Sequence, residues 1–405
     1  MINSLEINNN LLYYFVYGGK MKEKNKIASI LKNERESLGL TLKEVSNKIG
    51  FVHYQTLSSI ESGKREIKAW ELAKLANIYG RNIDFFLWPD ERKKETKILW
   101  RTPEENTKKE SIRRTFLSFC EKYKNLLELS GEKEEKNNEL LLSLTKNNLL
   151  NRYSFEYVSK IASDYLNLLQ LGSRPACSLT KILEEKVGIK TIHLELGPEI
   201  SGGSTVGDFG MAILINANDA PWRRNYDLAH EFFHLITWNY FSPEEIYKKD
   251  KKGKNRIEQL ADVFASAFLL PEDELRDEFR KKTEKNYITY LNLVDIAREF
   301  SVSIEALLWR LVNLDLIKKD AVIKELEKGS IKDLDRKFRH IYWEGEKPYI
   351  SARYISLAIK AFQMGKISKA KFAEYAGKKF SEVSSFLKKY GYDENEDYSV
   401  AYSIT

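Results

Sequence analysis

The 405-residue sequence predicts a mainly α-helical protein that contains one α+β part. Apolar residues recur with helical spacing over residues 22–89, and glycines divide that stretch into short helices. Two short apolar segments, KTIHLEL and FGMAILINA, have the composition of strands, and the segment SGGSTVG between them is typical of a glycine-rich loop. After Pro271 the spacing is again helical. We therefore expect a small sheet inside an otherwise helical chain.

Composition limits the class of protein. With 42% hydrophobic and 31% charged residues, a chain of this length can form several folded domains. Cys120 and Cys177 form no CxxC pair, which argues against a disulfide scaffold or a thiolate zinc site and favours a reducing compartment, so we expect a cytoplasmic protein. No apolar run reaches the roughly 18 residues of a membrane span, and no signal peptide is evident, so no membrane partner is expected.

The organisation along the chain suggests five parts. Residues 1–21 are expected to be a disordered lead-in, and residues 22–89 a compact helical module. Residues 90–150 are rich in charge, which is typical of a helical linker. Residues 151–275 form the α+β part, and residues 276–405 a helical C-terminal region with a regulatory or partner-binding role. The net charge of +7 permits a nucleic-acid partner without requiring one.

The strongest chemical signal is AHEFFH at residues 229–234, because an HExxH segment on a helix places His230 and His234 one turn apart on one face. Two imidazoles so placed can bind one metal ion. Glu231 lies beside them, where it can accept a proton from water that the metal activates. The chain has only 5 histidines, so a chance match to this spacing is improbable.

A catalytic zinc ion needs a third protein ligand, and the segment RIEQLADVFASAFLLP provides a carboxylate on a second helix. Glu258 is the expected ligand. Asp262, one turn later, is expected to accept the outer N–H of a ligand histidine and so to fix its tautomer. Alternatively, Glu258 is a solvated helix residue and the histidines fill a polar niche in the core.

Other residues near this site have two interpretations each. FGMAILINA is either an edge strand to which an extended substrate could add, or an ordinary core strand. Tyr226 and Tyr240 are either oxyanion donors or buried aromatic residues, with the second role favoured. His193 and His340 have no partners at ligand spacing and are expected to be structural or surface residues.

The helical module of residues 22–89 has the features of a DNA-binding domain with a recognition helix. In LTLKEVSNKIG and HYQTLSSIESG, one helix is followed by a turn at Gly50 and a second helix. Residues on the outer face of the second helix are candidates for contacting bases, and nearby basic residues are candidates for contacting phosphates. The candidate base contacts are His53, Tyr54, Gln55, Ser58 and Ser59, and the candidate phosphate contacts are Lys43, Lys64 and Arg65.

The stretch ILKNERESLGLTLKEVSNKIGFVHYQTLSSIESGKREIKAWELAKLANIYGRNIDFFL resembles the Xre/Cro type of helix-turn-helix domain. The resemblance implies a five-helix, lambda-repressor-like fold at residues 22–89 that binds double-stranded DNA. This range has 12 lysines and arginines against 8 acidic residues, and so modest a positive excess suits a homodimer that binds two half-sites of DNA. The alternative is a protein-binding or dimerisation module without DNA affinity.

RNYDLAHEFFHLI and IEQLADVFASAFLLP together resemble the ImmA/IrrE family of zinc metallopeptidases. The resemblance implies a zincin-like domain with a small sheet and one Zn²⁺ per chain, held by His230, His234 and Glu258 as in gluzincins. Glu231 is then the catalytic base. Two positions depart from the usual pattern, Phe233 and Asp227, and neither is a metal ligand.

Two main hypotheses of function follow. In the first, the protein binds DNA as a nucleoid-associated regulator, and its zinc endopeptidase domain cleaves a protein partner such as a repressor or an antitoxin. In the second, the protein is a sequence-specific transcriptional regulator whose zinc domain is sensory or structural. A third is an antitoxin-like member of a toxin module. The first two differ at Glu231, because Glu231→Gln should abolish cleavage under the first and leave repression unchanged under the second.

Overall fold

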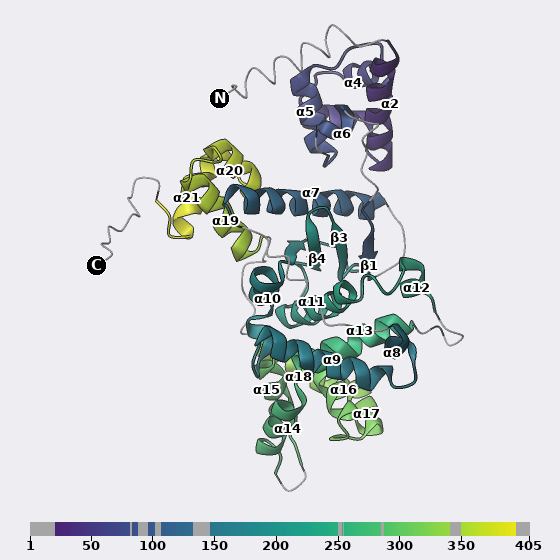
Figure 1. The fold of residues 1–405 in the computed structure, drawn as a ribbon, viewed down its shortest axis with the longest axis vertical. Coiled ribbons are helices and arrows are strands. Elements are labelled where there is room, and N and C mark those ends of the chain that lie inside the picture. The colour runs from purple at the N-terminus through teal and green to yellow at the C-terminus, as the bar shows by residue number, and fades with distance from the viewer. Residues whose placement is uncertain are drawn as a thin grey trace. The chain divides into compact units, whose positions relative to one another are not determined.

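The computed structural model of the chain separates into two compact units (Figure 1). The first unit comprises residues 1–95 and 104–119, and the second comprises residues 96–103 and 120–405. The residues that the structure describes are 21–81, 83–87, 96–101, 107–132, 146–249, 253, 255–284, 287–340 and 350–393. Residues 1–20 of the expected lead-in (residues 1–21) and parts of the expected linker lie outside these ranges.

The first unit is a helical module with its own core, as expected. Five short helices enclose apolar side chains that include Leu31, Val45 and Leu57, all fully buried. The chain turns after the second of them at Gly50, whose φ of +88° is a left-handed conformation that glycine adopts without strain. These helices are α2 (Met21–Ser37), α3 (Leu42–Ile49), α4 (Tyr54–Glu61), α5 (Ala69–Ile78) and α6 (Asp84–Leu87).

A buried ion pair connects two helices of this unit. Arg35 on α2 donates from Nε and Nη2 to the two carboxylate oxygens of Glu61 on α4, at 2.8 and 2.9 Å. Both residues are less than 9% exposed, so neither charge is well solvated. The paired geometry satisfies both groups and fixes the position of α4 against α2.

A four-stranded mixed sheet lies at the centre of the second unit, with strand order β1-β3-β4-β2. The chain runs antiparallel from β1 to β3 and from β3 to β4, whereas β2 is parallel to β4. The strands are β1 (Ile98–Trp100), β2 (Lys190–Leu194), β3 (Gly202–Gly207) and β4 (Gly210–Asn216).

Two of these strands differ from the sequence prediction. The glycine-rich segment SGGSTVG forms β3 rather than a loop. The backbones of the neighbouring strands come so close to it that only glycine fits at two of its positions. A Cβ atom at Gly202 would lie 2.6 Å from the carbonyl oxygen of Leu214, and one at Gly203 would lie 2.8 Å from that of Leu99. Strand β1 falls in the expected helical linker, where three residues are too few to produce a periodic signal.

Three helices of this unit surround the site: α9 (Ser154–Leu169), α11 (Pro221–Ile236) and α13 (Arg256–Leu269). Helix α11 packs against β3 and β4, and α13 packs against both α9 and α11. Aromatic side chains such as Phe232 and Phe264 fill the space between them. The shorter elements here are α8 (Lys146–Leu150), η3 (Pro175–Cys177), α10 (Leu179–Ile182), η4 (Leu183–Val187) and α12 (Pro243–Tyr247).

The apolar core does not end at residue 275, where the sequence analysis placed a domain boundary. The buried cluster that includes Phe232 of α11 and Phe264 of α13 also contains residues further along the chain: Leu275, Ile296, Leu307 and Ile331. The helical pattern after Pro271 therefore continues the α+β part rather than starting a separate region. These helices are α14 (Glu272–Lys281), α15 (Tyr290–Glu299), α16 (Ile304–Asn313), α17 (Lys319–Lys328) and α18 (Ser330–His340).

The last described helices pack on the second half of α7 (Thr107–Leu129). The rings of Tyr123 on α7 and Tyr354 meet edge to face with centroids 5.3 Å apart, and the Asn125 amide donates to the Tyr375 hydroxyl at 2.7 Å. The helices are α19 (Ala352–Gln363), α20 (Lys369–Ala376), η5 (Phe380–Glu382) and α21 (Val383–Lys389). Among the described residues, no helix is both long and apolar enough to cross a membrane.

Candidate metal centre

Helix α11 positions two histidines in the core. It begins with Pro221 at its first position, where the missing N–H costs no hydrogen bond. His230 and His234 lie four residues apart on one face and are only 1% and 3% exposed. Their Nε2 atoms are 3.2 Å apart. Two imidazoles held this close inside a core can bind one ligand through Nε2. The other ring nitrogen of His234, Nδ1, has no hydrogen-bond partner among the described residues.

Helix α13 brings a carboxylate to the same point. The side chain of Asn255 caps this helix by accepting hydrogen bonds from the backbone N–H groups of Ile257 and Glu258. The Glu258 carboxylate then lies 3.2 Å from His230 Nε2 and 3.3 Å from His234 Nε2. Glu258 is thus within contact of both rings and is not a solvated helix residue.

The three side chains fit a divalent cation. One ligand atom from each of His230, His234 and Glu258 can be chosen so that all lie within 4.8 Å of one another. Ligand atoms around a tetrahedral zinc ion with bonds of about 2.0 Å are about 3.3 Å apart. The two Nε2 atoms are 3.2 Å apart, and each lies 3.2–3.3 Å from a different oxygen of the Glu258 carboxylate. Two nitrogens and one carboxylate are also the donor set that catalytic zinc prefers.

Asp262 fixes the orientation of one ring. Its carboxylate Oδ1 is 3.0 Å from His230 Nδ1, one helical turn beyond Glu258. A proton on Nδ1 would be donated to this carboxylate, which leaves the Nε2 lone pair directed at the metal position. The structure therefore places Asp262 where the sequence analysis expected it.

Glu231 lies beside the ligands and under the sheet. It is 1% exposed, and a Cβ atom added to Gly202 of β3 would lie 3.8 Å from its Oε1 atom. The carboxylate of Glu231 therefore lies within ordinary contact distance of the Gly202 position on the strand. The carboxylate thus lies next to the cluster of His230, His234 and Glu258 without belonging to it.

Sequence analysis missed an arginine at this site. Arg101 follows β1 directly, forms a hydrogen-bonded ion pair with Asp227 on α11, and lies 3.5 Å from Asp262 Oδ1. The carboxylates of Glu231 and Glu258 are also close enough to raise the pKa of Arg101, against the lowering effect of burial. The only available signal was an arginine next to the apolar triplet ILW in charge-rich sequence.

The electrostatics of the site favour a positive charge between the histidines. Burial and Arg101 lower the pKa of His230, but hydrogen bonds with Asp262 and Glu258 outweigh them and raise it to about 9. Burial alone would raise the pKa of Glu258, yet its hydrogen bonds with His230 and His234 hold it well below its usual range. A site that stabilises an imidazolium in this way also stabilises a metal cation.

The structure decides between the alternative roles of neighbouring residues. Strand β4 pairs with β3 on one side and β2 on the other, so the prediction that FGMAILINA is an edge strand is wrong. The hydroxyl of Tyr226 donates to the Asp262 backbone carbonyl at 3.0 Å, and Tyr240 packs against the core. His193 is buried on β2, whereas the side chain of His340 lies outside the described residues.

The candidate DNA contacts lie on and around α4. The side chains of His53, Tyr54 and Gln55 are exposed at its first turn, and those of Ser58 and Ser59 are half-buried. Lys43 and Lys64 are exposed on either side of this helix. Most of the expected contacts are therefore accessible around one helix.

Arg65 differs from the other candidates. Its guanidinium donates to both carboxylate oxygens of the buried Glu71, at 2.8 and 3.2 Å. The same carboxylate accepts the backbone N–H of Lys68 at 2.9 Å. Arg65 thus has a structural partner that a phosphate contact would have to displace.

Comparisons with known proteins agree with both parts. Residues 31–86 match the family model described as helix-turn-helix, and residues 184–312 match that of the IrrE N-terminal-like domain, which is a peptidase family. A comparison with curated proteins gave no match. The chain therefore combines a DNA-binding helix-turn-helix domain with a metallopeptidase-type domain. The expected ImmA/IrrE and Xre-type resemblances are confirmed, and the match ends well beyond residue 275.

Proposed function

We propose that the protein is a DNA-binding regulator whose second unit is a zinc endopeptidase that cleaves a protein partner, such as a repressor or an antitoxin. The observation that carries this proposal is the convergence of His230, His234 and Glu258 with Glu231 beside them. One zinc ion per chain, held by the first three residues, would polarise the peptide carbonyl.

In the proposed reaction, Glu231 accepts a proton from the water that attacks the carbonyl carbon. The C–N bond then breaks, and Glu231 delivers that proton to the leaving amine nitrogen. Asp262 holds His230 in one tautomer, and the carboxylate of Glu231 lies beside the Gly202 position of β3. Removing the carboxylate therefore removes the proton transfer without removing a ligand.

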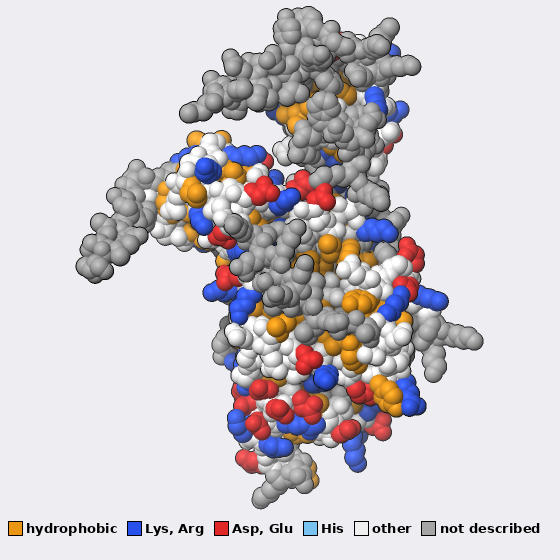
Figure 2. Space-filling model, in the orientation of Figure 1, with side chains coloured by type: hydrophobic (Ala, Val, Ile, Leu, Met, Phe, Trp, Pro, Cys, Tyr) orange, Lys and Arg blue, Asp and Glu red, His pale blue; other side chains and the backbone are white. Residues whose placement is uncertain are grey.

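DNA binding would occur through residues 22–89. The exposed Gln55 and the exposed Lys64 support contacts with a base and with a phosphate, respectively. In contrast, Figure 2 shows acidic and basic side chains intermixed over the lower end of the second unit, where α14 lies. Ion pairs such as Lys281–Glu278 at 2.9 Å neutralise the charges of that helix, so it is a poor phosphate-binding surface. A homodimer on two half-sites remains part of this proposal.

The experiment is co-expression with the products of neighbouring genes. We expect the wild-type protein to yield a truncated partner and Glu231→Gln to yield none, with zinc content unchanged in the purified variant. His230→Ala should lose both zinc and cleavage. Glu156→Gln, an exposed carboxylate on α9, is the matched control and should behave like wild type. Cleavage by the Glu231→Gln protein would contradict the proposed base.

A second candidate is a transcriptional regulator with a sensory or structural zinc domain. One observation favours it: β3, the strand next to Glu231, is paired on both edges, so an extended peptide cannot add to it unless β1 leaves. Under this alternative, Glu231→Gln should leave repression of a reporter unchanged, whereas His230→Ala should change it. No cleaved partner should then appear in the co-expression experiment.

A further inference from the structure

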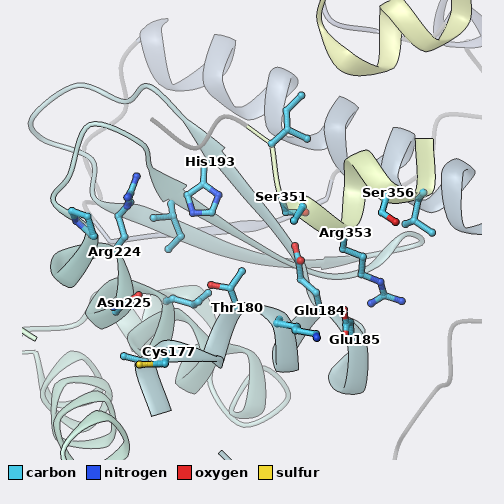
Figure 3. Close-up of a pocket in the computed structure, with 18 of the residues that line it drawn as sticks. Cys177, Thr180, Glu184, Glu185, His193, Arg224, Asn225, Ser351, Arg353 and Ser356 are labelled. Atoms are coloured by element: carbon cyan, nitrogen blue, oxygen red, sulfur yellow. The ribbon is translucent and has the colours of Figure 1, made fainter. Parts of the chain in front are cut away.

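The second unit contains a cavity of about 920 Å³ that the metal ligands do not line. It lies among β2, η4, the first turns of α11 and the start of α19 (Figure 3). Its volume is within the roughly 300–1,000 Å³ typical of small-molecule sites. The regulatory role expected of residues 276–405 names no ligand for this cavity, and the proposed peptidase reaction does not use it.

Buried polar atoms in the cavity wall lack partners among the described residues. His193 on β2 is 9% exposed and Glu184 on η4 is 3% exposed, yet His193 Nδ1 and Glu184 Oε1 have no hydrogen-bond partner. Leaving such atoms unsatisfied costs about 1–3 kcal/mol each, so a bound molecule is expected to pair with them.

One end of the cavity carries positive charge. Figure 3 shows Arg224 on the same side of the cavity as His193. Arg224 forms no ion pair with any described residue, and burial together with its charge lowers the pKa of His193 to about 4. The N-terminus of α11, a 16-residue helix that begins at Pro221, adds its partial positive charge here. The carboxylate of Asp219 is close enough to raise the pKa of Arg224, against the larger lowering effect of burial, but the two form no ion pair.

The opposite end carries acidic groups. Glu184 and Glu185 lie there together with Arg353 (Figure 3). Arg353 pairs with Glu132 at 3.5 Å, so its charge is partly balanced by a carboxylate of its own. Ile215 and Leu228 contribute apolar surface to the lining. Lys181 also lines the cavity, so its charged lining holds both signs, with Arg224 and Glu184 at opposite ends.

We propose that this cavity binds a small zwitterion of the amino-acid or short-peptide type. Its carboxylate faces Arg224 and His193, its ammonium group faces Glu184, and its side chains contact Ile215 and Leu228. The proposal concerns a site separate from the metal centre and does not depend on peptidase activity.

The test is isothermal titration calorimetry of the full-length protein with the tripeptides that can be built from alanine and leucine. We expect saturable binding with one site per chain, and at least tenfold weaker binding when the peptides are amidated at the C-terminus or acetylated at the N-terminus. Inorganic phosphate is the comparison ligand. Binding of phosphate without binding of any tripeptide would mean a simple anion site. Binding of neither ligand would mean that the cavity holds only water. Either result would overturn the proposal.

Two variants locate the contacts. Arg224→Gln should weaken the free peptides at least tenfold and leave the C-terminally amidated forms unaffected. Glu184→Gln should weaken the free peptides at least tenfold and leave the N-terminally acetylated forms unaffected. Arg336→Gln on α18 is the matched control, because its side chain is 75% exposed and its ion pair with Asp333 is on the surface. Circular dichroism and zinc content establish that each variant is folded. Equal binding by wild type and both variants would place the peptides elsewhere and refute this site.

Discussion

At the scale of single residues, the ion pair between Arg101 and Asp227 is the most consequential contact outside the ligand set. The side chain of Asp227 is 2% exposed, and burial raises its pKa to about 6 against the positive charges of Arg101 and Arg223. Arg101→Gln would leave this carboxylate buried with little compensation. We expect the variant to lose about 3 kcal/mol of unfolding free energy at pH 8, measured by chemical denaturation of the second unit's transition.

The pH dependence of this loss has a defined sign. Because the folded pKa of Asp227 exceeds its unfolded value, the folded state holds the proton more tightly, and stability falls as the pH rises from about 4 to 6. Removing Arg101 raises the folded pKa further, so the destabilisation should be smaller at pH 5 than at pH 8. Adding Asp227→Asn to Arg101→Gln should recover most of the loss. A loss that is equal at both pH values would mean that charge burial is not its cause.

Glu184 provides a second pH-dependent prediction. Burial raises its pKa to about 7, although the hydrogen bond from Ser351 and the charge of Arg353 oppose the shift. The free energy of unfolding therefore falls as the pH rises from 4.5 through 7, and the full loss, about 3 kcal/mol, is reached above that range. Glu184→Gln should be more stable than wild type at pH 8 and nearly equal at pH 5, measured by thermal unfolding without added ligand. A variant less stable than wild type at pH 8 would show that the carboxylate is stabilised by contacts.

The sequence predicted that the side chains of the candidate metal centre would come together, because helical spacing fixes local geometry. His230 and His234 had to share a face, and Glu258 and Asp262 had to be one turn apart on the next helix. Arg101 could not be found in this way, since its place depends on a strand more than 100 residues earlier in the chain than its partner. The cavity was missed for the same reason, because its walls come from distant segments.

At the scale of elements, β3 depends on glycine for close packing. A Cβ atom at Gly202 would lie 2.6 Å from the backbone oxygen of Leu214 on β4, and neither strand can move without disturbing the sheet. We expect Gly202→Ala to cost about 1–3 kcal/mol in the unfolding transition of the second unit and to reduce cleavage, because Glu231 lies against the same position.

Gly197→Ala is the matched control for this prediction. A Cβ atom there would meet nothing within 4 Å, and its backbone is not in the left-handed region, so the change should alter the unfolding free energy by less than about 0.5 kcal/mol. If both alanine variants unfold like wild type, the two strands approach less closely than the structure indicates.

Sequence pattern predicted helices better than strands, for reasons visible in particular elements. Helices α11 and α13 are long and amphipathic, and Asn255 supplies a recognisable cap. Strand β1 is only three residues long, and β3 contains two adjacent glycines that resemble a loop. Strand β4 was recognised, but whether it lay at the edge depended on β3, which the pattern indicated as a loop.

At the scale of the whole molecule, the two units have separate cores. The buried cluster of the first unit, which includes Leu31 and Leu57, shares no residue with the cluster that surrounds the metal centre. The sequence predicted this separation, because residues 22–89 have their own helical pattern and glycine turns. It did not predict that the core of the second unit extends to Ile331, since helical spacing does not reveal which helices share a core.

Separate cores mean that DNA binding should survive loss of the metal. We expect His230→Ala to bind a duplex of random sequence with wild-type affinity and with the same dependence on salt, measured by fluorescence anisotropy. Lys64→Ala should instead reduce the slope of log affinity against log salt by about 0.9, because one phosphate contact is lost. Lys319→Ala, an exposed lysine of α17, is the matched control and should leave the slope unchanged. A weaker affinity for His230→Ala, with the slope unaltered, would reveal that the metal centre controls the DNA-binding unit through the chain that joins them.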